Sequence, residues 1–396
     1  MKFANIFKNL VLAMALAASL FGAAFYAKAS EVRGFSKLNY LNYDSPNDNL
    51  NNSELFQINR LSFVTQLSEQ FSFESSYEFS QIYTDIESPL LKKSYSAADK
   101  DYRIDDIEQY FDLRENYYYL NQNLDRLFAT YEKEQLLITF GRQPIAFGSG
   151  SGVNPTDVFT PFSYTTIDTE ERNGVDAVRL RYELDNMGQL DMGILFGKSF
   201  NSEKSAFYGL VKLPFADFEV QPMLAYFKTA MLVGLDITTG ILGASVWLES
   251  AWVKTSEEKE YFRSVLGFTR QLSTDLTLTA EYYFNGAGRT KKQEYANLLT
   301  DFAHTEGGVF VFGQNYLHLT LAHQLAALHG VFLSLKNNLD DSSDLVILGW
   351  EWNVLENTYV NVGSYLNLKQ DNKNEINKTE FGSLPKTIFT RVRYYF

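Results

Sequence analysis

Short segments in which apolar and polar residues alternate one by one recur along most of this chain. The segment 276–284, "LTLTAEYYF", places Leu, Leu, Ala, Tyr and Phe on one side of an extended strand and Thr, Thr, Glu and Tyr on the other. The segments 71–79 and 346–352 alternate in the same way. Because successive side chains of a strand point to opposite faces, these segments predict strands with one apolar and one polar face. We therefore expect an all-β fold.

Helical membrane spans are not predicted for the chain after residue 29. The closest candidate, 229–253, carries Asp236 and Glu249 and is interrupted by Thr-Thr-Gly, so we interpret it as two strands and a turn. A chain crosses lipid only as helices or as a closed barrel, because every backbone polar group needs a partner there. Apolar-out and polar-in alternation is typical of a transmembrane barrel that encloses water. The alternative is a soluble β-sandwich with a core built from the 25 Tyr and 32 Phe residues.

Eighteen segments have this strand character, and the connections between them alternate in length. The predicted strands are 33–42, 54–67, 71–84, 124–132, 136–146, 174–184, 188–199, 203–214, 217–228, 231–238, 241–254, 260–271, 275–285, 314–324, 328–338, 343–353, 358–370 and 385–396. Connections after even-numbered strands are all short, whereas those after odd-numbered strands include the long segments 85–123, 147–173, 286–313 and 371–384. Short periplasmic turns and long extracellular loops are typical of an antiparallel up-and-down transmembrane β-barrel.

Two alternatives for the number of strands stay open at this point. The segment 85–123 contains "IEQYFDL" and "YYYL", which could form an extra hairpin and give twenty strands. Sixteen strands would result if 231–254 were not two strands. In all three cases the barrel is a single domain that covers 30–396.

The first 29 residues read as a cleaved secretory signal peptide. Lys2 and Lys8 form a basic start, an apolar stretch follows, and "AKA" ends at Ala29, so we expect cleavage before Ser30. A transmembrane anchor is the alternative, but the apolar run is short for a span of about 20 residues. The exported chain has no cysteine, so it forms no disulfides and no thiolate metal site, and we expect neither a metal nor a cofactor. The full sequence has a net charge of −13, and removal of Lys2, Lys8 and Lys28 with the signal peptide makes it −16, so nucleic acid is an unsuitable partner.

The last ten residues, "TIFTRVRYYF", have one apolar and one charged face and end on Phe396. This segment resembles the closing strand of Gram-negative outer-membrane β-barrels. The resemblance implies a location in the cell outer membrane, contact with lipid and lipopolysaccharide, and recognition of this strand by the barrel assembly machinery. Trimers are usual among similar porins, so the resemblance also implies a homotrimer as one state of assembly.

The stretch 141–166, "GRQPIAFGSGSGVNPTDVFTPFSYTT", opens the third long connection, 147–173. A Gly-Arg-Gln before an Asn-Pro-x-Asp loop is similar to a group of porin-like outer-membrane proteins. In general porins the third loop folds inward and faces arginines on the wall, so the resemblance implies that 147–173 is a constriction loop. A loop on the outer surface is the alternative. A phosphate-binding loop is not indicated, because "GSGSG" is followed by neither a Lys nor a helix.

Charged side chains of the predicted strands fall on the polar, lumen-facing parity. The basic residues are Lys37, Arg60, Arg126, Arg179, Arg181, Lys369, Arg391 and Arg393, and the acidic ones are Glu219, Glu249, Glu281 and Glu351. The carboxylates of the loop are Asp157, Asp168, Glu170 and Glu171. We expect the arginines and the loop carboxylates to form a constriction with a transverse field that orients solutes. The alternative is local pairing of these charges. Arg142 has outward parity unless a bulge intervenes near Gly141.

A barrel of sixteen to eighteen strands is too wide for its own side chains to fill and leaves an aqueous lumen. The predicted function is therefore a porin, a channel for passive diffusion of small hydrophilic solutes or ions, and not an enzyme. One alternative is an outer-membrane hydrolase with an active site at the rim, for which His304 near Asp301 is the only candidate pair. Another is a barrel that sheathes a periplasmic partner protein.

Overall fold

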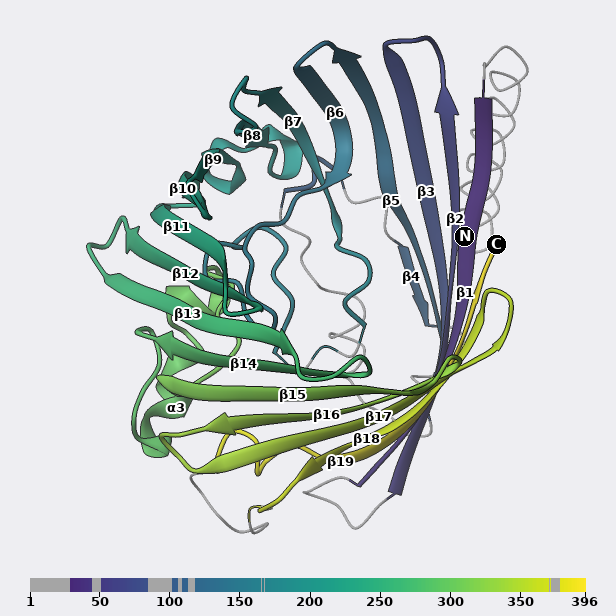
Figure 1. Cartoon of the computed structure of the whole chain (residues 1–396), viewed down its shortest axis with the longest axis vertical. Coiled ribbons are helices and arrows are strands. Elements are labelled where there is room, and N and C mark those ends of the chain that lie inside the picture. Colours follow the sequence, from purple (N-terminus) through teal and green to yellow (C-terminus); the bar gives the residue numbers. More distant parts are fainter. Residues whose placement is uncertain are drawn as a thin grey trace.

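The computed structural model describes residues 29–44, 51–84, 102–105, 109–112, 118–164, 166, 168–369, 371 and 378–396. Antiparallel strands wind around a central space and enclose other parts of the chain (Figure 1). The predicted signal peptide lies outside the described residues, except for Ala29, with which strand β1 begins.

The described part of the chain contains eighteen long strands and one short one. Their bounds are β1 (Ala29–Asp44), β2 (Asn51–Gln66), β3 (Phe71–Thr84), β4 (Gln109–Asp112), β5 (Tyr118–Lys133), β6 (Leu136–Pro144), β7 (Gly174–Glu183), β8 (Gln189–Leu195), β9 (Ala206–Phe215), β10 (Phe218–Phe227), β11 (Ala230–Ile241), β12 (Ala244–Thr255), β13 (Glu260–Gln271), β14 (Leu276–Asn285), β15 (Asn315–Ala326), β16 (His329–Asn338), β17 (Ser343–Leu355), β18 (Thr358–Asn367) and β19 (Lys386–Tyr395). Each predicted strand has a counterpart, and those predicted at 71–84 and 260–271 match to the residue.

Pairing between the first and last strands closes the barrel. Each long strand is antiparallel to the next, and β19 pairs with β1 over ten positions from Phe35↔Tyr395 to Asp44↔Lys386. In the described part of the chain, closure pairs both edges of each of the eighteen long strands, and a sheet in lipid could not tolerate an unpaired edge. The prediction of a closed up-and-down barrel with eighteen spanning strands is confirmed.

The short length and the pairing of strand β4 exclude the alternative of twenty spanning strands. It has four residues and pairs with β5 at Tyr119–Gln122, beyond the point where β6 ends. Residues 118–120 of the "YYYL" segment form the start of β5 instead of a second strand of a hairpin, and residue 117 lies outside the described residues. The alternative of sixteen strands is also excluded, because β11 and β12 are a regular hairpin.

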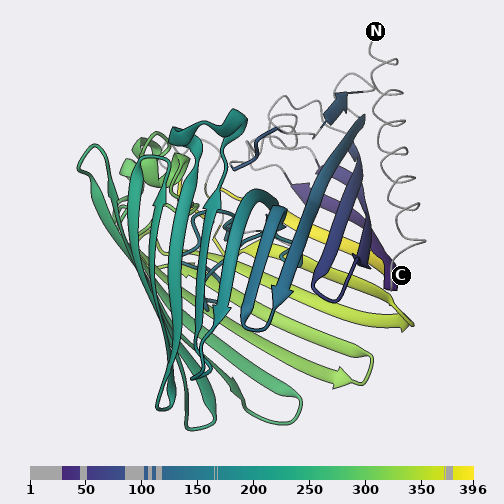
Figure 2. The same ribbon diagram turned by 90° about the horizontal axis from the view of Figure 1, so that it is seen from above.

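The connections differ in length between the two ends of the barrel (Figure 2). We call the end with turns such as 134–135, 216–217 and 242–243 the turn end, and the opposite end the loop end. The helices of the described residues belong to connections at the loop end: η1 (Lys198–Phe200), η2 (Ser202–Lys204), η3 (Lys292–Glu294), α3 (Tyr295–Leu298) and α4 (Phe302–Thr305). Among the described residues, none of these helices has the length and hydropathy of a membrane span.

The two faces of the wall differ as the alternation predicts. On β17, Leu348, Trp350 and Trp352 lie on the exposed outer face, whereas Leu345 and Ile347 are buried inside. The rings of His329 on β16, Trp350 and Trp352 pack against one another, with the His329 centroid 5.8 and 5.7 Å from those of the two tryptophans, which are 6.0 Å apart. This aromatic group lies near the turn end, and such groups are enriched where a membrane meets water.

A bulge in β5 changes the inner face at one place. Ser76 of β3 pairs with Arg126 and Tyr77 pairs with Leu124, so Asp125 is the extra residue. As a result Asp125 and Arg126, although adjacent in sequence, are both buried inside the barrel. Bulges commonly re-aim a side chain in this way.

Candidate functional site

The connection between β6 and β7 runs through the inside of the barrel (Figure 1). It leaves the wall after Pro144 and returns to it at Gly174. We call residues 147–156 the first lobe and residues 161–171 the second lobe. Between them, Asp157 forms an ion pair of 3.0 Å with Arg172, which ties the middle of the segment to its end.

The first lobe binds carboxylates that project from the acidic side of the wall. Glu249 of β12 accepts hydrogen bonds from the backbone nitrogens of Ser149 and Gly150 at 3.2 Å and from that of Thr156 at 2.7 Å. Glu281 of β14 accepts from the backbone nitrogens of residues 151 and 152 at 2.6 and 2.8 Å. Hydrogen bonds to an ionised acceptor are among the strong ones. The acidic wall therefore holds this lobe by its backbone.

The glycines of "GSGSG" are needed for this close approach. A Cβ atom on Gly148 would lie 2.5 Å from a carboxylate oxygen of Glu249, and the residue has a φ of +96°. A Cβ on Gly152 would lie 2.7 Å from Nδ1 of His318. Glycine tolerates both the contact and the positive φ. The alternation of the strands does not by itself predict these carboxylate partners of the stretch.

The second lobe places its own carboxylates against the basic side of the wall. Lys37 of β1 lies 2.8 Å from Asp168 and 2.7 Å from Glu170. Arg393 of β19 binds Glu170, and Arg391 lies 3.6 Å from Asp168. Burial alone would raise the pKa of Glu170, but hydrogen bonds from Lys37 and Tyr395 and nearby positive charges lower it to about 2.

Glu171 reaches a second basic group around the bulge of β5. Its carboxylate lies 3.2 Å from Arg60 and 3.5 Å from Arg126. Asp125 is central to this group, because it also binds Arg60 at 3.0 Å and Arg103 at 3.2 Å. Strict alternation does not predict Asp125 on the inner face beside Arg126, since it assigns adjacent residues to opposite faces. The segment 102–105, which contains Arg103, lies inside the wall, where the backbone of Asp176 bonds to that of Tyr102.

Other residues predicted for the constriction lie apart from this contact. Arg179 of β7 pairs with Asp191 of the neighbouring strand, and Arg181 projects beside it. Asp157 is fully buried and forms its ion pair with Arg172 of its own segment, while Arg263 of β13 also favours its charged form. Burial raises the pKa of Asp157 to about 6, although Arg172 and backbone hydrogen bonds act against the rise.

The charges of the remaining predicted positions are distributed around the lumen. Glu351 binds Arg393, and Glu219 pairs with Lys212 near the turn end. Lys369 is exposed beyond the end of β18.

Arg142 does not face outward as strict alternation predicts. It is buried inside and bonds through Nε to Asp176 at 2.8 Å. The physical reason is Gly141, whose φ of +116° interrupts the alternation of β6. A Cβ at this position would lie 2.3 Å from the carbonyl oxygen of Leu127. The sequence predicts an inward Arg142 only with an irregularity near Gly141, and the backbone of Gly141 has such an irregularity.

Asp301 and His304, the candidate pair for an enzyme, do not contact each other through their side chains but bind other groups. The carboxylate of Asp301 lies 3.3 Å from Arg289, and Nε2 of His304 lies 3.0 Å from the backbone oxygen of Val311. Burial lowers the pKa of His304, so the imidazole is neutral at pH 7. This geometry gives His304 no carboxylate that would orient it as a base.

A second histidine has the neighbours that an acid–base array requires, but it lacks access. Nε2 of His318 lies 2.9 Å from Oγ of Ser334, and its Nδ1 lies 3.2 Å from Glu281. The order serine, histidine, carboxylate is that of hydrolases. Ser334, however, is only 5% exposed, and Glu281 also accepts the backbone N–H groups of the first lobe. The array thus holds the inward segment in place.

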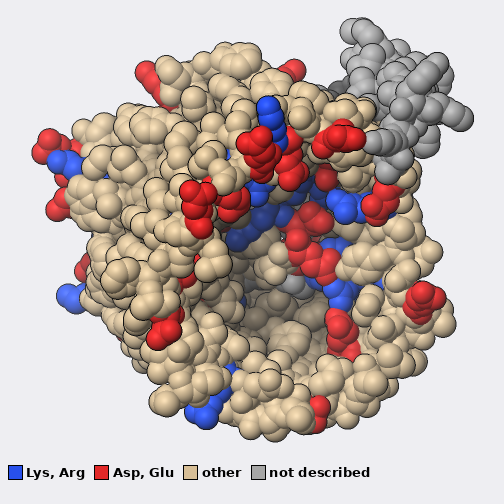
Figure 3. Space-filling model, turned by 45° about the horizontal axis from the view of Figure 1, so that its top comes forward, with Lys and Arg blue, Asp and Glu red and all other residues tan. Residues whose placement is uncertain are grey.

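A narrow passage separates the second lobe from the wall of β17–β19. A space of about 210 Å³ lies between residues 168–170 and the lumen-facing side chains of these strands, among them Glu351, Arg391 and Arg393. In the space-filling view, acidic and basic side chains line the hollow at the mouth of the barrel (Figure 3). Charges of both signs therefore face any solute that enters.

Aromatic rings lie flat against the wall beside this passage. The ring of Phe332 covers Gly349, where a Cβ would lie 2.1 Å from the ring. The ring of Phe389 covers Gly363 in the same way, at 2.4 Å. Gly349 and Gly363 are paired across β17 and β18. The absence of side chains at these two positions leaves room for the rings without narrowing the lumen.

Comparison with known proteins identifies the fold. No family model matches the chain, and no curated protein sequence matches it. Among solved structures, Pseudomonas aeruginosa OccK5 (OpdH) has a TM-score of 0.56 at 10% identity, covering 93% of this chain and 98% of its own. Acinetobacter baumannii OccAB1 has a TM-score of 0.56 at 7% identity, covering 94% and 97%. Pseudomonas aeruginosa OccK3 (OpdO) has a TM-score of 0.55 at 12% identity, covering 94% and 96%. The chain therefore has the fold of the Gram-negative outer-membrane porins.

Proposed function

We propose that this protein is an outer-membrane channel through which small hydrophilic solutes or ions diffuse passively. The observation that carries the proposal is the segment 147–173, which crosses the lumen and contacts both sides of the wall. Its backbone binds the carboxylates of Glu249 and Glu281, and its carboxylates bind Lys37 and Arg393. A barrel of eighteen strands is too wide to be filled by its wall alone, so a segment of this kind narrows the water-filled path.

Selectivity follows from the opposed charges along this path. Arg391 and Arg393 project from β19 and Asp168 and Glu170 from the second lobe; they form ion pairs with each other, and all four line the passage. Charges of both signs in a narrow channel of low dielectric create a field that orients a dipolar solute, so the solute enters preferentially with its dipole in one orientation. Asp168, Glu170, Glu171, Arg60, Arg126, Arg391 and Arg393 form the proposed constriction.

The fold supports the remaining parts of the proposal. The barrel would insert in the outer membrane after removal of residues 1–29, with β19 recognised by the barrel assembly machinery and the loop end in contact with lipopolysaccharide. A homotrimer would be the state of assembly. We propose no enzymatic activity, because Ser334 has no access to substrate and His304 has no orienting carboxylate. A sheathed partner protein is not favoured, because the inward segment occupies the space that it would need.

Conductance of the purified protein in planar bilayers tests this function. The double variant Arg391→Glu and Arg393→Glu should shift the reversal potential in a salt gradient toward cation selectivity. The control is Lys259→Glu with Lys291→Glu, which makes the same change in net charge at exposed positions of the loop end. An equal shift in both variants, or none in the first, would contradict the constriction. A protein that inserts without conducting would contradict the channel.

A further inference from the structure

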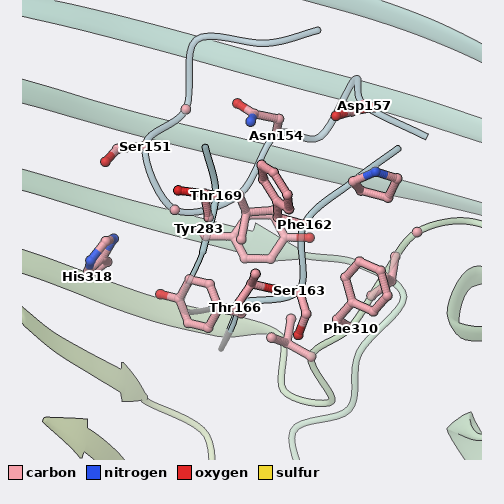
Figure 4. Close-up of a pocket in the computed structure, with 18 of the residues that line it drawn as sticks. Ser151, Asn154, Asp157, Phe162, Ser163, Thr166, Thr169, Tyr283, Phe310 and His318 are labelled. Carbon is pink, nitrogen blue, oxygen red and sulfur yellow. The ribbon is translucent and has the colours of Figure 1, made fainter. Parts of the chain in front are cut away.

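A cavity of about 300 Å³ lies beside the inward segment (Figure 4). Residues 150–154 of the first lobe and 161–164 of the second form two of its sides. Residues 308–311 of the β14–β15 connection form the third, and Tyr283 and His318 project from the wall. Ligand sites in proteins begin at about this volume. The cavity therefore has room for one small solute.

The ionisable groups around the cavity are already compensated. Asp157 pairs with Arg172 at 3.0 Å, and His318 bonds to Glu281 at 3.2 Å. The ammonium group of Lys336 donates to a backbone oxygen of the second lobe and is attracted by Glu281. A charged ligand would have to displace one of these partners. A neutral ligand would leave all of them in place.

Three polar atoms at the cavity are buried without a hydrogen-bond partner in the described part of the chain. Oδ2 of Asp157 is compensated by its ion pair with Arg172, whereas the hydroxyl of Tyr164 and Oδ1 of Asn154 have no partner among the described residues. Tyr164 is only 4% exposed, so water does not satisfy its hydroxyl from outside. Buried polar groups in native proteins nearly always have a partner, and an unpaired one requires an explanation. Both atoms accept hydrogen bonds, and the tyrosine also donates one. A ligand that carries several hydroxyl groups would satisfy both once the two side chains turn toward the cavity, since neither atom is exposed to it in the described structure.

Aromatic side chains complete the lining. Phe162 and Phe310 enter the cavity from two different connections, and Tyr283 enters from β14, as Figure 4 shows. Ring faces carry a partial negative charge, so they attract the weakly positive C–H groups of a saturated ring. The cavity thus offers hydrogen-bonding atoms for hydroxyl groups and aromatic rings for C–H groups. This combination suits a saturated ring that carries hydroxyl groups at its periphery. A carboxylate has no hydrogen to donate to Oδ1 of Asn154.

We propose that this cavity is a binding subsite for a small, uncharged, polyhydroxylated solute the size of a monosaccharide. Thr169 lines both the cavity and the passage between the second lobe and β17–β19, so a bound solute would lie beside the diffusion path. The inference rests on the proposed channel function and adds a substrate class to it. The charged passage orients solutes, and the neutral cavity retains those with matching hydroxyl groups.

Interruption of single-channel current by added solutes tests the subsite. D-glucose should interrupt the current of the wild-type channel in a concentration-dependent way, and gluconate at the same concentration should interrupt it much less. Tyr164→Phe and Asn154→Leu should each raise the half-blocking concentration of glucose about fivefold, the effect of one hydrogen bond. Tyr226→Phe is the matched control, since this tyrosine is exposed on the outer face of β10, and it should leave the block unchanged.

The outcomes separate this inference from the channel function. A conducting wild-type channel that glucose does not block, or that gluconate blocks equally, overturns the subsite and leaves the channel in place. Equal block of the Tyr164→Phe, Asn154→Leu and wild-type channels overturns it as well. If the inserted protein does not conduct, the channel function is contradicted. Equilibrium binding of labelled glucose to the detergent-solubilised protein then tests whether the cavity binds a sugar. Binding that Tyr164→Phe weakens would support the subsite, and no binding would overturn it.

Discussion

Lys37 of strand β1 forms an ion pair of 2.7 Å with Glu170 of the second lobe, 133 positions further along the chain. The lysine is 1% exposed, and it also contacts Asp168 at 2.8 Å. A cation buried to this degree is stable only when its partners compensate the loss of water. This pair therefore joins the strand that closes the barrel to the segment that narrows it.

Replacing Lys37 by methionine should loosen the second lobe. The variant Lys37→Met leaves Asp168 and Glu170 facing each other without the ammonium group, and unfolding should become easier by about 1–3 kcal/mol, below the range for fully buried pairs because both carboxylates are partly exposed. Urea titration of the refolded protein measures the stability, and open-channel noise in bilayers measures the motion of the lobe. Lys259→Met, at an exposed position, is the control. Unchanged noise and stability would show that the pair does not hold the lobe.

The lowered pKa of Glu170 predicts that the second lobe is released only in strong acid. An acid with a pKa lowered to about 2 in the folded state stabilises that state above its unfolded value of about 4.3, and this stabilisation is lost as pH falls from there through 2. Open-channel noise should therefore stay constant between pH 8 and pH 5 and rise below about 4. Glu170→Gln should show the higher noise at every pH. A rise already near pH 6 in the wild type would contradict the assignment.

Asp157 predicts a pH dependence of opposite sign. Its pKa of about 6 exceeds the unfolded value of about 3.9, so the folded state binds the proton more tightly. Its contribution to stability therefore decreases as pH rises from about 4 to about 6 and is constant above that. The variant Asp157→Asn should remove this slope in urea titrations at pH 4, 5, 6 and 7. Asp217→Asn, exposed at a turn, should retain it.

The group around Asp125 should be sensitive to a neutral isostere. Asp125→Asn removes the charge shared by Arg60, Arg103 and Arg126 and leaves three buried guanidinium groups close together. Breaking a buried ion pair costs about 3–5 kcal/mol, so we expect a loss of stability of about 3 kcal/mol or a failure to fold. Urea titration and the yield of folded barrel measure the two outcomes, and Asp275→Asn at the turn end is the control. A stability equal to that of the wild type would show that Asp125 is not the centre of the group.

The glycine under Phe332 predicts a change in pore width. Because a Cβ on Gly349 would lie 2.1 Å from that ring, Gly349→Ala should push the ring into the lumen and lower the single-channel conductance. Gly240→Ala is the control, since a Cβ there meets nothing within 4 Å. Combining Gly349→Ala with Phe332→Ala should restore the conductance. A lower conductance that persists in the double variant would instead indicate a distorted strand.

The barrel itself could be predicted because its information is local. Alternation with a period of two defined every spanning strand, and in β13 the predicted bounds 260–271 equal the observed ones. The lengths of the connections then distinguished the turn end of the barrel from its loop end. Errors appeared where the backbone departs from regular alternation, at Arg142 beside Gly141 and at Asp125 in the bulge of β5. Both departures depend on neighbouring strands, which a single segment does not contain.

The sequence alone predicted a closed β-barrel, because the side-chain period indicates strands and a sheet in lipid must pair every backbone polar group. It also indicated which connection was long and acidic enough to reach arginines. Only the tertiary structure decided which groups meet across the lumen: Glu249 with the backbone of Thr156, Lys37 with Glu170, and Asp157 with Arg172 instead of with the wall. These contacts join residues far apart in the chain, and their geometry depends on the barrel's diameter and on the path of a loop that no periodic pattern encodes.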